Sequence, residues 1–275
     1  MMAKKSKNKG WRIAGKSLLF LAKTPYYLGK GIYYAGKGVY RAGKYVSKKN
    51  KERKINKKRK SMLPTYQDFK ILKEVQGKYS EWEKKTLNSD SKIGIILGAR
   101  GSGKSAFGIK FLENIKAKKN KKIYAMGFKE AEMPDWIKVV ENVQDLGNDA
   151  FVLIDEGGIL FSSRNSMSNA NKLLSELILI ARHKNLNILF ISQNSSNLDV
   201  NILRQADFLV LKPSSLLQKD FERKSVQKLY EKTEDDFEKF KENKGITYIH
   251  SSNFTGFVSN PLPSFWGEKL SKSFG

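Results

Sequence analysis

The sequence predicts an α/β domain with a mainly parallel β-sheet flanked by helices, behind a basic N-terminal leader (residues 1–60) that is helical or disordered. Three observations predict it. Short apolar, β-branched runs alternate with longer amphipathic stretches across residues 91–250. A glycine-rich loop joins one such run to a helical stretch, and an acidic pair ends another. The leader has a different composition from everything that follows it.

Composition limits the function classes. With 275 residues and 40% hydrophobic content, the chain can form one sizeable core and an appendage. It has no cysteine and two histidines, which excludes disulfides and thiolate zinc sites and makes a metal-rich site unexpected. No apolar run is long enough to span a bilayer or to serve as a signal peptide. We expect a cytoplasmic protein, with peripheral membrane or virion association as further options.

The leader carries most of the net charge of +25, since it contains 20 Lys or Arg residues and one acid. Within it, a small residue followed by lysine recurs every seven positions, at Lys16, Lys23, Lys30, Lys37 and Lys44. On a helix this spacing aligns the lysines, opposite an apolar stripe with tyrosines between the two. The pattern is typical of an interfacial helix, so we expect residues 11–60 to contact an anionic membrane surface.

Other interpretations of the leader stay open. The run from Lys48 to Lys60 also suits nucleic-acid phosphates. The regularly spaced glycines could pack helix against helix in an oligomer, and they weaken an isolated helix, which leaves a solvated tail as the remaining interpretation.

The first apolar run of the domain leads into a phosphate-binding motif. The stretch from Lys92 to Gly98 reads as a buried strand, and a helical pattern follows the loop "GARGSGKS". That loop fits G-x-x-x-x-G-K-[ST], the Walker A pattern, and the strand before it and helix after it are the required context. We therefore predict that ATP is bound by eight consecutive residues: Gly98, Ala99, Arg100, Gly101, Ser102, Gly103, Lys104 and Ser105.

Each residue type in the loop has a physical role. The glycines let backbone N–H groups point at phosphate oxygens, and the helix N-terminus adds its partial positive charge. Lys104 is expected on the β- and γ-phosphates, and the Ser105 hydroxyl on Mg²⁺. For Arg100, a solvent-exposed side chain is the alternative.

An acidic pair ends the run from Phe151 to Ile154. Asp155 at the tip of such a strand would hold Mg²⁺, and Glu156 beside it would polarise the attacking water as a general base. This arrangement looks like a Walker B motif and favours ATP hydrolysis. The alternative is a surface acid pair that closes a strand.

Further strands are predicted at Lys121–Gly127, Leu186–Ser192 and Ala206–Lys212, with a helix over Asn171–Lys184. Gln193 follows the second of these strands, where a polar amide could sense the γ-phosphate and orient water. The predicted site residues thus fall at the carboxyl ends of strands, where open α/β sheets bind ligands.

The flanks carry no recognisable chemistry. We expect a helical bridge over residues 61–90, the ATPase domain over 91–250, and an extended C-terminal arm over 251–275, which could lie across a neighbour.

The order of these motifs, with "ARHKNLNILFISQN" and "LRQADFLVLKPSS" after "VLIDEGG", resembles the HerA–FtsK superfamily of P-loop ATPases. The resemblance covers about residues 90–215. The small size is similar to viral genome-packaging ATPases and to zonular-occludens-toxin-like assembly ATPases. It implies a P-loop NTPase fold of the RecA/FtsK type, a homo-oligomeric ring, and DNA or peptides as cargo.

The resemblance also assigns roles: Lys104 and Ser105 to the nucleotide, Asp155 to Mg²⁺, Glu156 to catalysis and Gln193 to sensing. A neighbouring subunit would supply an arginine. We favour Arg182, with Arg204 and Arg164 as rivals and a plain surface position as the alternative for each. We expect His183 to be a helix-end residue. No separate DNA-recognition domain is evident.

Together these features predict an ATP-driven ring motor that translocates or packages viral or mobile-element DNA. One rival is a membrane-associated assembly or secretion ATPase that moves protein. A second rival is a membrane- or nucleic-acid-binding module switched by nucleotide.

Overall fold

The computed structural model describes residues 37, 40–41, 43–157 and 167–267, in two compact units, residues 1–55 and 56–275. In the first unit residues 43–55 are helical, and nearly all their side chains, including Tyr45 and Val46, are exposed. This part of the leader is therefore helical, while residues 1–36, which hold most of the lysine repeat, lie outside the described residues. No helix among the described residues is long and apolar enough to cross a membrane.

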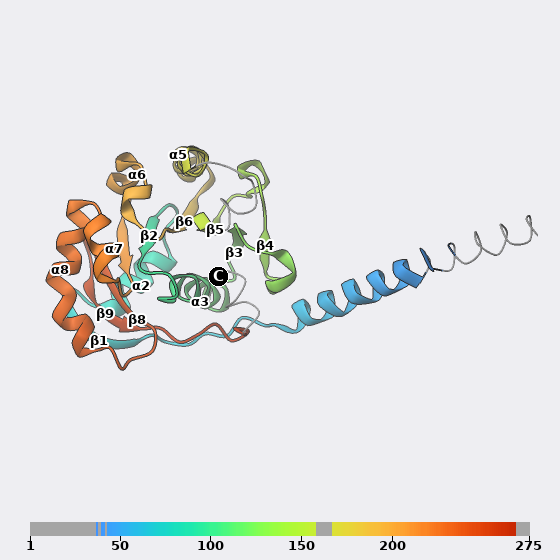
Figure 1. The fold of residues 1–275 in the computed structure, drawn as a ribbon, viewed down its shortest axis with the longest axis horizontal. Helices are drawn as coiled ribbons and strands as arrows, with labels where there is room; N and C mark the ends of the chain where they lie inside the picture. The colour runs from blue at the N-terminus through green and yellow to red at the C-terminus, as the bar shows by residue number, and fades with distance from the viewer. Residues whose placement is uncertain (1–36, 38–39, 42, 158–166, 268–275) are drawn as a thin grey trace, which may run out of the picture. The chain divides into compact units, whose positions relative to one another are not determined.

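The second unit contains one nine-stranded sheet (Figure 1). Its order is β1-β9-β8-β7-β2-β6-β5-β3-β4. The six strands from β7 to β4 are parallel, while β8, β9 and β1 are joined by antiparallel pairings. The strands are β1 (Lys70–Gln76), β2 (Ile93–Leu97), β3 (Lys122–Met126), β4 (Ile137–Val139), β5 (Ala150–Asp155), β6 (Leu186–Ile191), β7 (Phe208–Leu211), β8 (Ile246–Ser251) and β9 (Thr255–Ser259).

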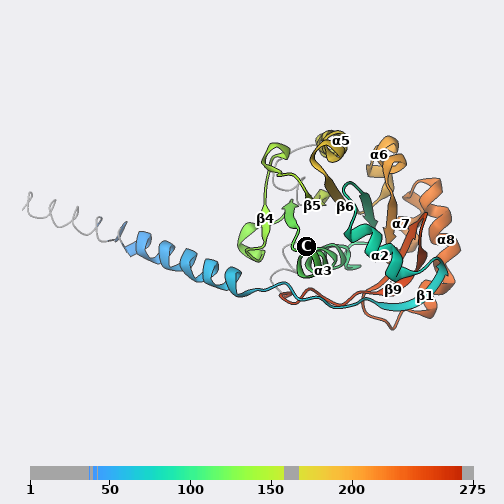
Figure 2. The same ribbon diagram turned by 180° about the vertical axis from the view of Figure 1, so that it is seen from behind.

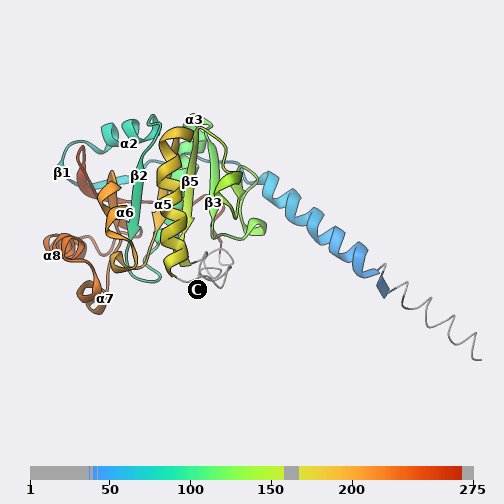
Figure 3. The same cartoon turned by 90° about the horizontal axis from the view of Figure 1, so that it is seen from above.

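Helices cover both faces of the sheet, which gives two apolar layers. Helices α2 (Tyr79–Leu87) and α3 (Lys104–Lys119) pack on one face, and α5 (Met167–Lys184), α6 (Val200–Gln205) and α8 (Lys224–Lys239) on the other (Figures 1 and 3). The strand β2 shows why: Ile95 and Leu97 belong to one core and Ile96 to the other, as alternate strand residues must. The expected α/β architecture is confirmed.

The connections are short. They include the helix α7 (Leu216–Phe221) and three single 3₁₀ turns, η1 (Glu130–Glu132), η2 (Val143–Asp145) and η3 (Ser195–Asn197). Because β6 lies between β2 and β5, the segments that follow these three strands meet at one edge of the sheet.

The sequence predicts a helical bridge over residues 61–90, but the structure shows that this segment is only partly helical. It contains the strand β1, which pairs antiparallel with β9, and only then the helix α2. Leu72 and Glu74 of β1 are half-buried, whereas the apolar Ile71 and Val75 are exposed. Apolar residues therefore occur on both faces of the strand, and the sequence shows no clear alternation of apolar and polar residues. The distant partner β9 decides the conformation.

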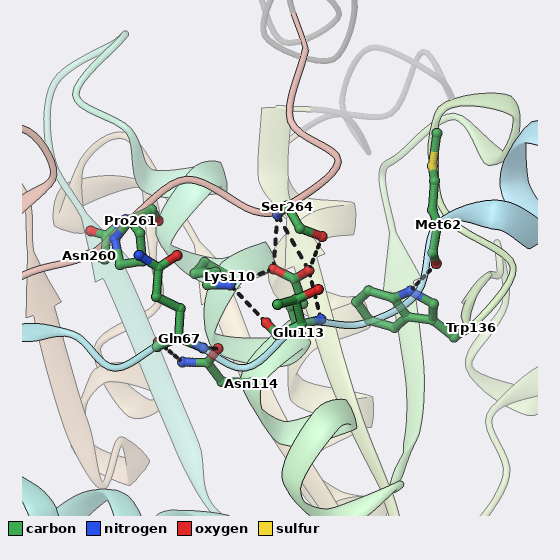
Figure 4. Close-up of polar contacts among 10 residues, drawn as sticks. Met62, Gln67, Lys110, Glu113, Asn114, Trp136, Asn260, Pro261 and Ser264 are labelled. Carbon is green, nitrogen blue, oxygen red and sulfur yellow. Dashed lines mark hydrogen bonds and ion pairs between the residues drawn. The ribbon is translucent and has the colours of Figure 1, made fainter.

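The C-terminal arm is also different from the expectation. Residues 251–259 complete the β8–β9 hairpin inside the same sheet. The following residues run beside residues 62–67 along α3 (Figures 1 and 2). The buried Glu113 of α3 joins both segments (Figure 4): it accepts hydrogen bonds from the backbone N–H of Thr65 (3.2 Å) and of Ser264 (3.1 Å).

A buried ion pair stabilises this junction. The Lys110 ammonium lies 2.8 Å from the Glu113 carboxylate and donates to the Thr65 carbonyl at 2.9 Å. Asn114 exchanges two hydrogen bonds with the backbone of Gln67, and the Trp136 indole donates to the Met62 carbonyl (Figure 4). The compact unit therefore starts well before the expected boundary at residue 91.

Candidate functional site

The glycine-rich loop, here called the P-loop (Gly98–Ser105), connects β2 to α3 as predicted. Gly98, Gly101 and Gly103 all have positive φ angles, of 146°, 76° and 89°. L side chains rarely adopt such angles, which explains the glycines. At Gly98 space is a second reason, because a Cβ there would lie 2.6 Å from Cβ of Lys212.

Lys104 and Ser105, the last two residues of the P-loop, are also the first two residues of α3. The Lys104 side chain is buried, and its ammonium donates to the carbonyls of Gly98 (2.7 Å) and Ala99 (2.9 Å). Burial lowers its pKa, against the opposing effect of the carboxylates of Asp155, Glu156 and Glu222. The ammonium therefore lies at the N-terminus of α3 and within electrostatic reach of three acids.

The acidic pair meets the P-loop from β5. The Ser105 hydroxyl donates to Asp155 at 3.1 Å, so a hydroxyl and a carboxylate oxygen are adjacent, as a Mg²⁺ ion held partly by water requires. Asp155 and Glu156 are 8% and 4% exposed. No cluster of three or more His, Cys, Asp or Glu side chains that could hold a metal occurs in the described part of the chain. A cation there would thus depend on nucleotide phosphates and water as well.

Glu156 is held by the segment that follows β6. The Ser192 hydroxyl donates to its carboxylate, and a backbone hydrogen bond from Gln193 also reaches it. Burial raises the pKa of Glu156, the nearby charge of Asp155 raises it further, and these hydrogen bonds oppose the shift. A buried, oriented carboxylate with a raised pKa has the properties of a general base.

The site fits a nucleotide by its own geometry. The Ser102 hydroxyl oxygen is buried and has no hydrogen-bond partner. Such an orphaned group inside a loop of positive-φ glycines suits a phosphate oxygen, as does the α3 N-terminus. Ala99 is partly buried, whereas the Arg100 side chain is exposed to solvent, which was the alternative interpretation for this residue.

The predicted sensor is only partly where we expected it. Gln193 follows β6 beside the acidic pair, but its side chain is exposed and it is its backbone that contacts Glu156. A polar network fixes the next residues: Ser195 donates from its N–H to Glu222 at 2.7 Å, and Arg223 donates to the Ser195 carbonyl at 3.0 Å.

The arginines lie elsewhere. Arg182 is exposed in the last turn of α5, next to Lys184, whose carbonyl accepts from the N–H of Asp149 at the start of β5. That is the edge where the parallel strands begin, opposite the P-loop. Arg204 lies in the last turn of α6 at the same edge, just before β7, and His183 is likewise exposed in the last turn of α5. Arg164 lies outside the described residues. None of these described side chains reaches the site of its own chain.

Sequence reasoning missed three residues near the P-loop: Ser192, Glu222 and Lys212. Ser192 and Lys212 are the last residues of two predicted strands and directly follow the observed strands β6 and β7, at the same edge as the acidic pair, and that position was the available signal. Nothing local marks Glu222, which reaches the site through the fold after α7.

Comparison with known proteins agrees with the motifs. The family described as "Zonular occludens toxin (Zot)" matches residues 126–211, less than half of the chain. This match confirms the resemblance to zonular-occludens-toxin-like ATPases inferred above. It includes β5, the acidic pair and β6. No curated protein matches the chain in sequence.

Among solved structures, the chain is similar to the DNA-packaging ATPase from Sulfolobus turreted icosahedral virus, at 16% identity and a TM-score of 0.42, over 64% of this chain and 99% of that one. It is similar to the N-terminal domain of zonular occludens toxin from Neisseria meningitidis, at 16% identity and a TM-score of 0.31, over 44% and 76%. It is also similar to the pCW3 conjugation coupling protein TcpA, at 14% identity and a TM-score of 0.44, over 68% and 65%.

Proposed function

We propose that this protein is an ATP hydrolase. One observation carries the proposal: the structure joins the P-loop lysine and serine, the Asp155 carboxylate and the buried Glu156 at the same edge of a parallel sheet. A phosphate oxygen would provide a partner for the orphaned Ser102 hydroxyl, and a Mg²⁺ ion bound to the triphosphate would suit the adjacent oxygens of Ser105 and Asp155.

In this proposal each residue has a role. Lys104 exchanges the carbonyls of Gly98 and Ala99 for β- and γ-phosphate oxygens. Ser105 and Asp155 would hold Mg²⁺, which would supply positive charge to neutralise the phosphates. Glu156, positioned by the Ser192 hydroxyl, accepts the proton of the attacking water.

We propose further that hydrolysis drives a homo-oligomeric ring that moves viral or mobile-element DNA, with the basic leader as a grip or tether. The leader's 20 basic residues and single acid support a polyanionic partner. Arg182 and Arg204 lie at the edge of the sheet where the parallel strands begin, and neither reaches the site of its own chain. We propose that one of them, Arg182 in preference to Arg204, enters a neighbouring subunit's site across a head-to-tail interface.

A second candidate is a membrane-associated assembly ATPase that moves protein. The family match over residues 126–211 favours it, together with the lysine and tyrosine pattern of the leader. In this case residues 11–60 contact anionic lipid and the protein is peripheral to the membrane.

Steady-state ATP hydrolysis by the full-length protein, with and without double-stranded DNA, tests the proposal. Glu156→Gln is the blank, because it keeps the shape of the side chain and removes the base. We expect turnover by the wild type that DNA stimulates. Turnover that is indifferent to DNA, with flotation of the protein on anionic liposomes, would favour the assembly ATPase, and no turnover with intact ATP binding would favour a switch.

A mixing experiment tests the ring and the arginine. Arg182→Ala subunits added to wild-type subunits should lower activity by more than dilution, because each replaced subunit disables its neighbour. Arg204→Ala is the matched comparison. Activity that falls only in proportion to dilution would exclude Arg182 as the shared arginine.

A further inference from the structure

The buried lysine Lys212 directly follows β7, the strand next to the P-loop strand. Its side chain is fully buried. Its ammonium donates to the Gly245 carbonyl (3.1 Å), the Thr247 hydroxyl (2.7 Å) and the Asn260 side-chain carbonyl (3.1 Å). An ammonium has three protons, so these neutral groups accept all of them. This geometry is that of the protonated, charged form.

The Lys212 side chain lies against the P-loop. Its Cβ is 2.6 Å from the position that a Cβ on Gly98 would take. Its Cε and Nζ are 3.6 and 3.9 Å from the corresponding position on Gly103. Gly103 is the N-cap of α3, where the helix presents its positive end. A second cation besides Lys104 thus lies at the cradle in which phosphates are expected.

In the described part of the chain, no carboxylate compensates this charge. The hydrogen-bond partners come from β8 and from the residues flanking the β8–β9 hairpin and are uncharged. Among the described residues, the titratable group in contact with Lys212 is Tyr230 from α8, whose hydroxyl donates to the Lys212 carbonyl at 3.2 Å. Burial alone lowers the pKa of Lys212 to about 7. The cation is therefore held at a cost that a nearby anion would offset.

We propose that Lys212 is a positioning residue of the nucleotide site: it supplies positive charge behind the P-loop, and phosphate binding is coupled to its protonation. This inference rests on the proposed function. The phosphates enter the cradle from one side of the loop and Lys212 supports it from the other. Because an anion favours the charged amine, nucleotide binding raises the pKa of Lys212, takes up a proton, and weakens as the pH rises above about 7.

A purely structural lysine would join β7 to the hairpin and do nothing more, so the test must measure protons. MgADP binding to the full-length protein is measured by calorimetry between about pH 6 and 9, in buffers of different ionisation enthalpy. MgADP avoids hydrolysis, and its own ionisation is common to all variants. We expect the wild type to take up more protons than Lys212→Met, with its affinity falling by up to about tenfold per pH unit in the coupled range.

Lys212→Met keeps the length of the side chain and removes the charge. We expect it to bind MgADP about tenfold or more weakly near pH 6, and with a smaller dependence on pH. Lys110→Met is the matched control, since Lys110 is an equally buried lysine that has a carboxylate partner and contacts Glu113 and Thr65. We expect it to lose stability and to keep the proton uptake of the wild type.

Thr247→Val provides a second variant if Lys212→Met fails to fold. It removes the acceptor of the shortest hydrogen bond of the Lys212 ammonium. The pKa of Lys212 should therefore fall, and proton uptake should occur over a lower pH range. Equal proton uptake by wild type and Lys212→Met, or an unchanged range in Thr247→Val, would overturn the proposal. The proposal would also be overturned if the wild type bound MgADP without taking up a proton. Absence of MgADP binding at every pH would instead remove the proposed function itself.

Discussion

Gly98 and Gly101 of the P-loop are required for different physical reasons, and alanine substitution at each position distinguishes backbone strain from steric crowding. Gly98 and Gly101 both have positive φ angles, so alanine strains the backbone at either position. Only Gly98 is also crowded. A Cβ there would lie 2.6 Å from Cβ and 3.0 Å from the carbonyl oxygen of Lys212, whereas nothing lies within 4 Å of a Cβ on Gly101. The carbonyl belongs to the backbone, so it cannot turn aside as a flexible side chain would.

The difference can be given a magnitude. Backbone strain contributes about 1–3 kcal/mol at each position. Forcing a methyl group into packed surroundings adds about 1–3 kcal/mol at Gly98 alone. We therefore expect Gly98→Ala to lower the free energy of unfolding by about 2–6 kcal/mol, and Gly101→Ala by about 1–3 kcal/mol. Urea unfolding of both variants, followed by circular dichroism, measures this. Equal losses for the two variants, or a larger loss for Gly101→Ala, would refute the packing argument.

The remaining predictions concern the site and the α3 junction. Lys104→Ala should abolish nucleotide binding in equilibrium titrations, because it removes the phosphate cation; wild-type affinity would contradict that role. Glu156→Gln should bind ATP but not hydrolyse it, and full turnover would exclude Glu156 as the base. Because burial raises the pKa of Glu156, activity should be lost on acidification at a higher pH than for an ordinary glutamate. Ser192→Ala removes a hydrogen bond that favours the carboxylate, so this acidic limb of the pH–rate profile should move to higher pH still, and an unmoved limb would exclude the contact. Glu113→Gln should destabilise the protein by about 3 kcal/mol or less, since an amide keeps part of the hydrogen bonding. Hydrogen exchange should then speed up at Thr65 and Ser264, and unchanged protection there would refute the junction.

The strands and the P-loop were predictable because their signals are local. β2, β5 and β6 are short apolar runs buried on both faces, and such runs differ sharply from the lysine-rich sequence around them. The P-loop has fixed spacing and glycines that only positive φ angles require. Strand ends at one edge of a parallel sheet converge, so Lys104, Asp155 and Glu156 could be placed together without coordinates.

The edge strand β1 and the contacts of Lys212 behind the P-loop could not be predicted in this way. β1 has apolar residues on its exposed side and forms a strand because β9, far along the chain, offers hydrogen bonds. In the sequence Lys212 resembles a solvated lysine at the end of a strand, but in the fold it is buried and donates to Thr247 and Asn260, which are distant in sequence. Contacts between residues distant in sequence leave no periodic trace.

The junction on α3 connects the helix that starts at the P-loop to both flanking segments of the compact unit. The chain that leaves the leader and the chain that leaves β9 are both fastened to Glu113. Glu113 lies nine residues after Lys104 in the same rigid rod, which is about 14 Å along the axis. Because Thr65 and Ser264 both donate hydrogen bonds to Glu113, a shift of α3 at its P-loop end would move the two flanking segments together.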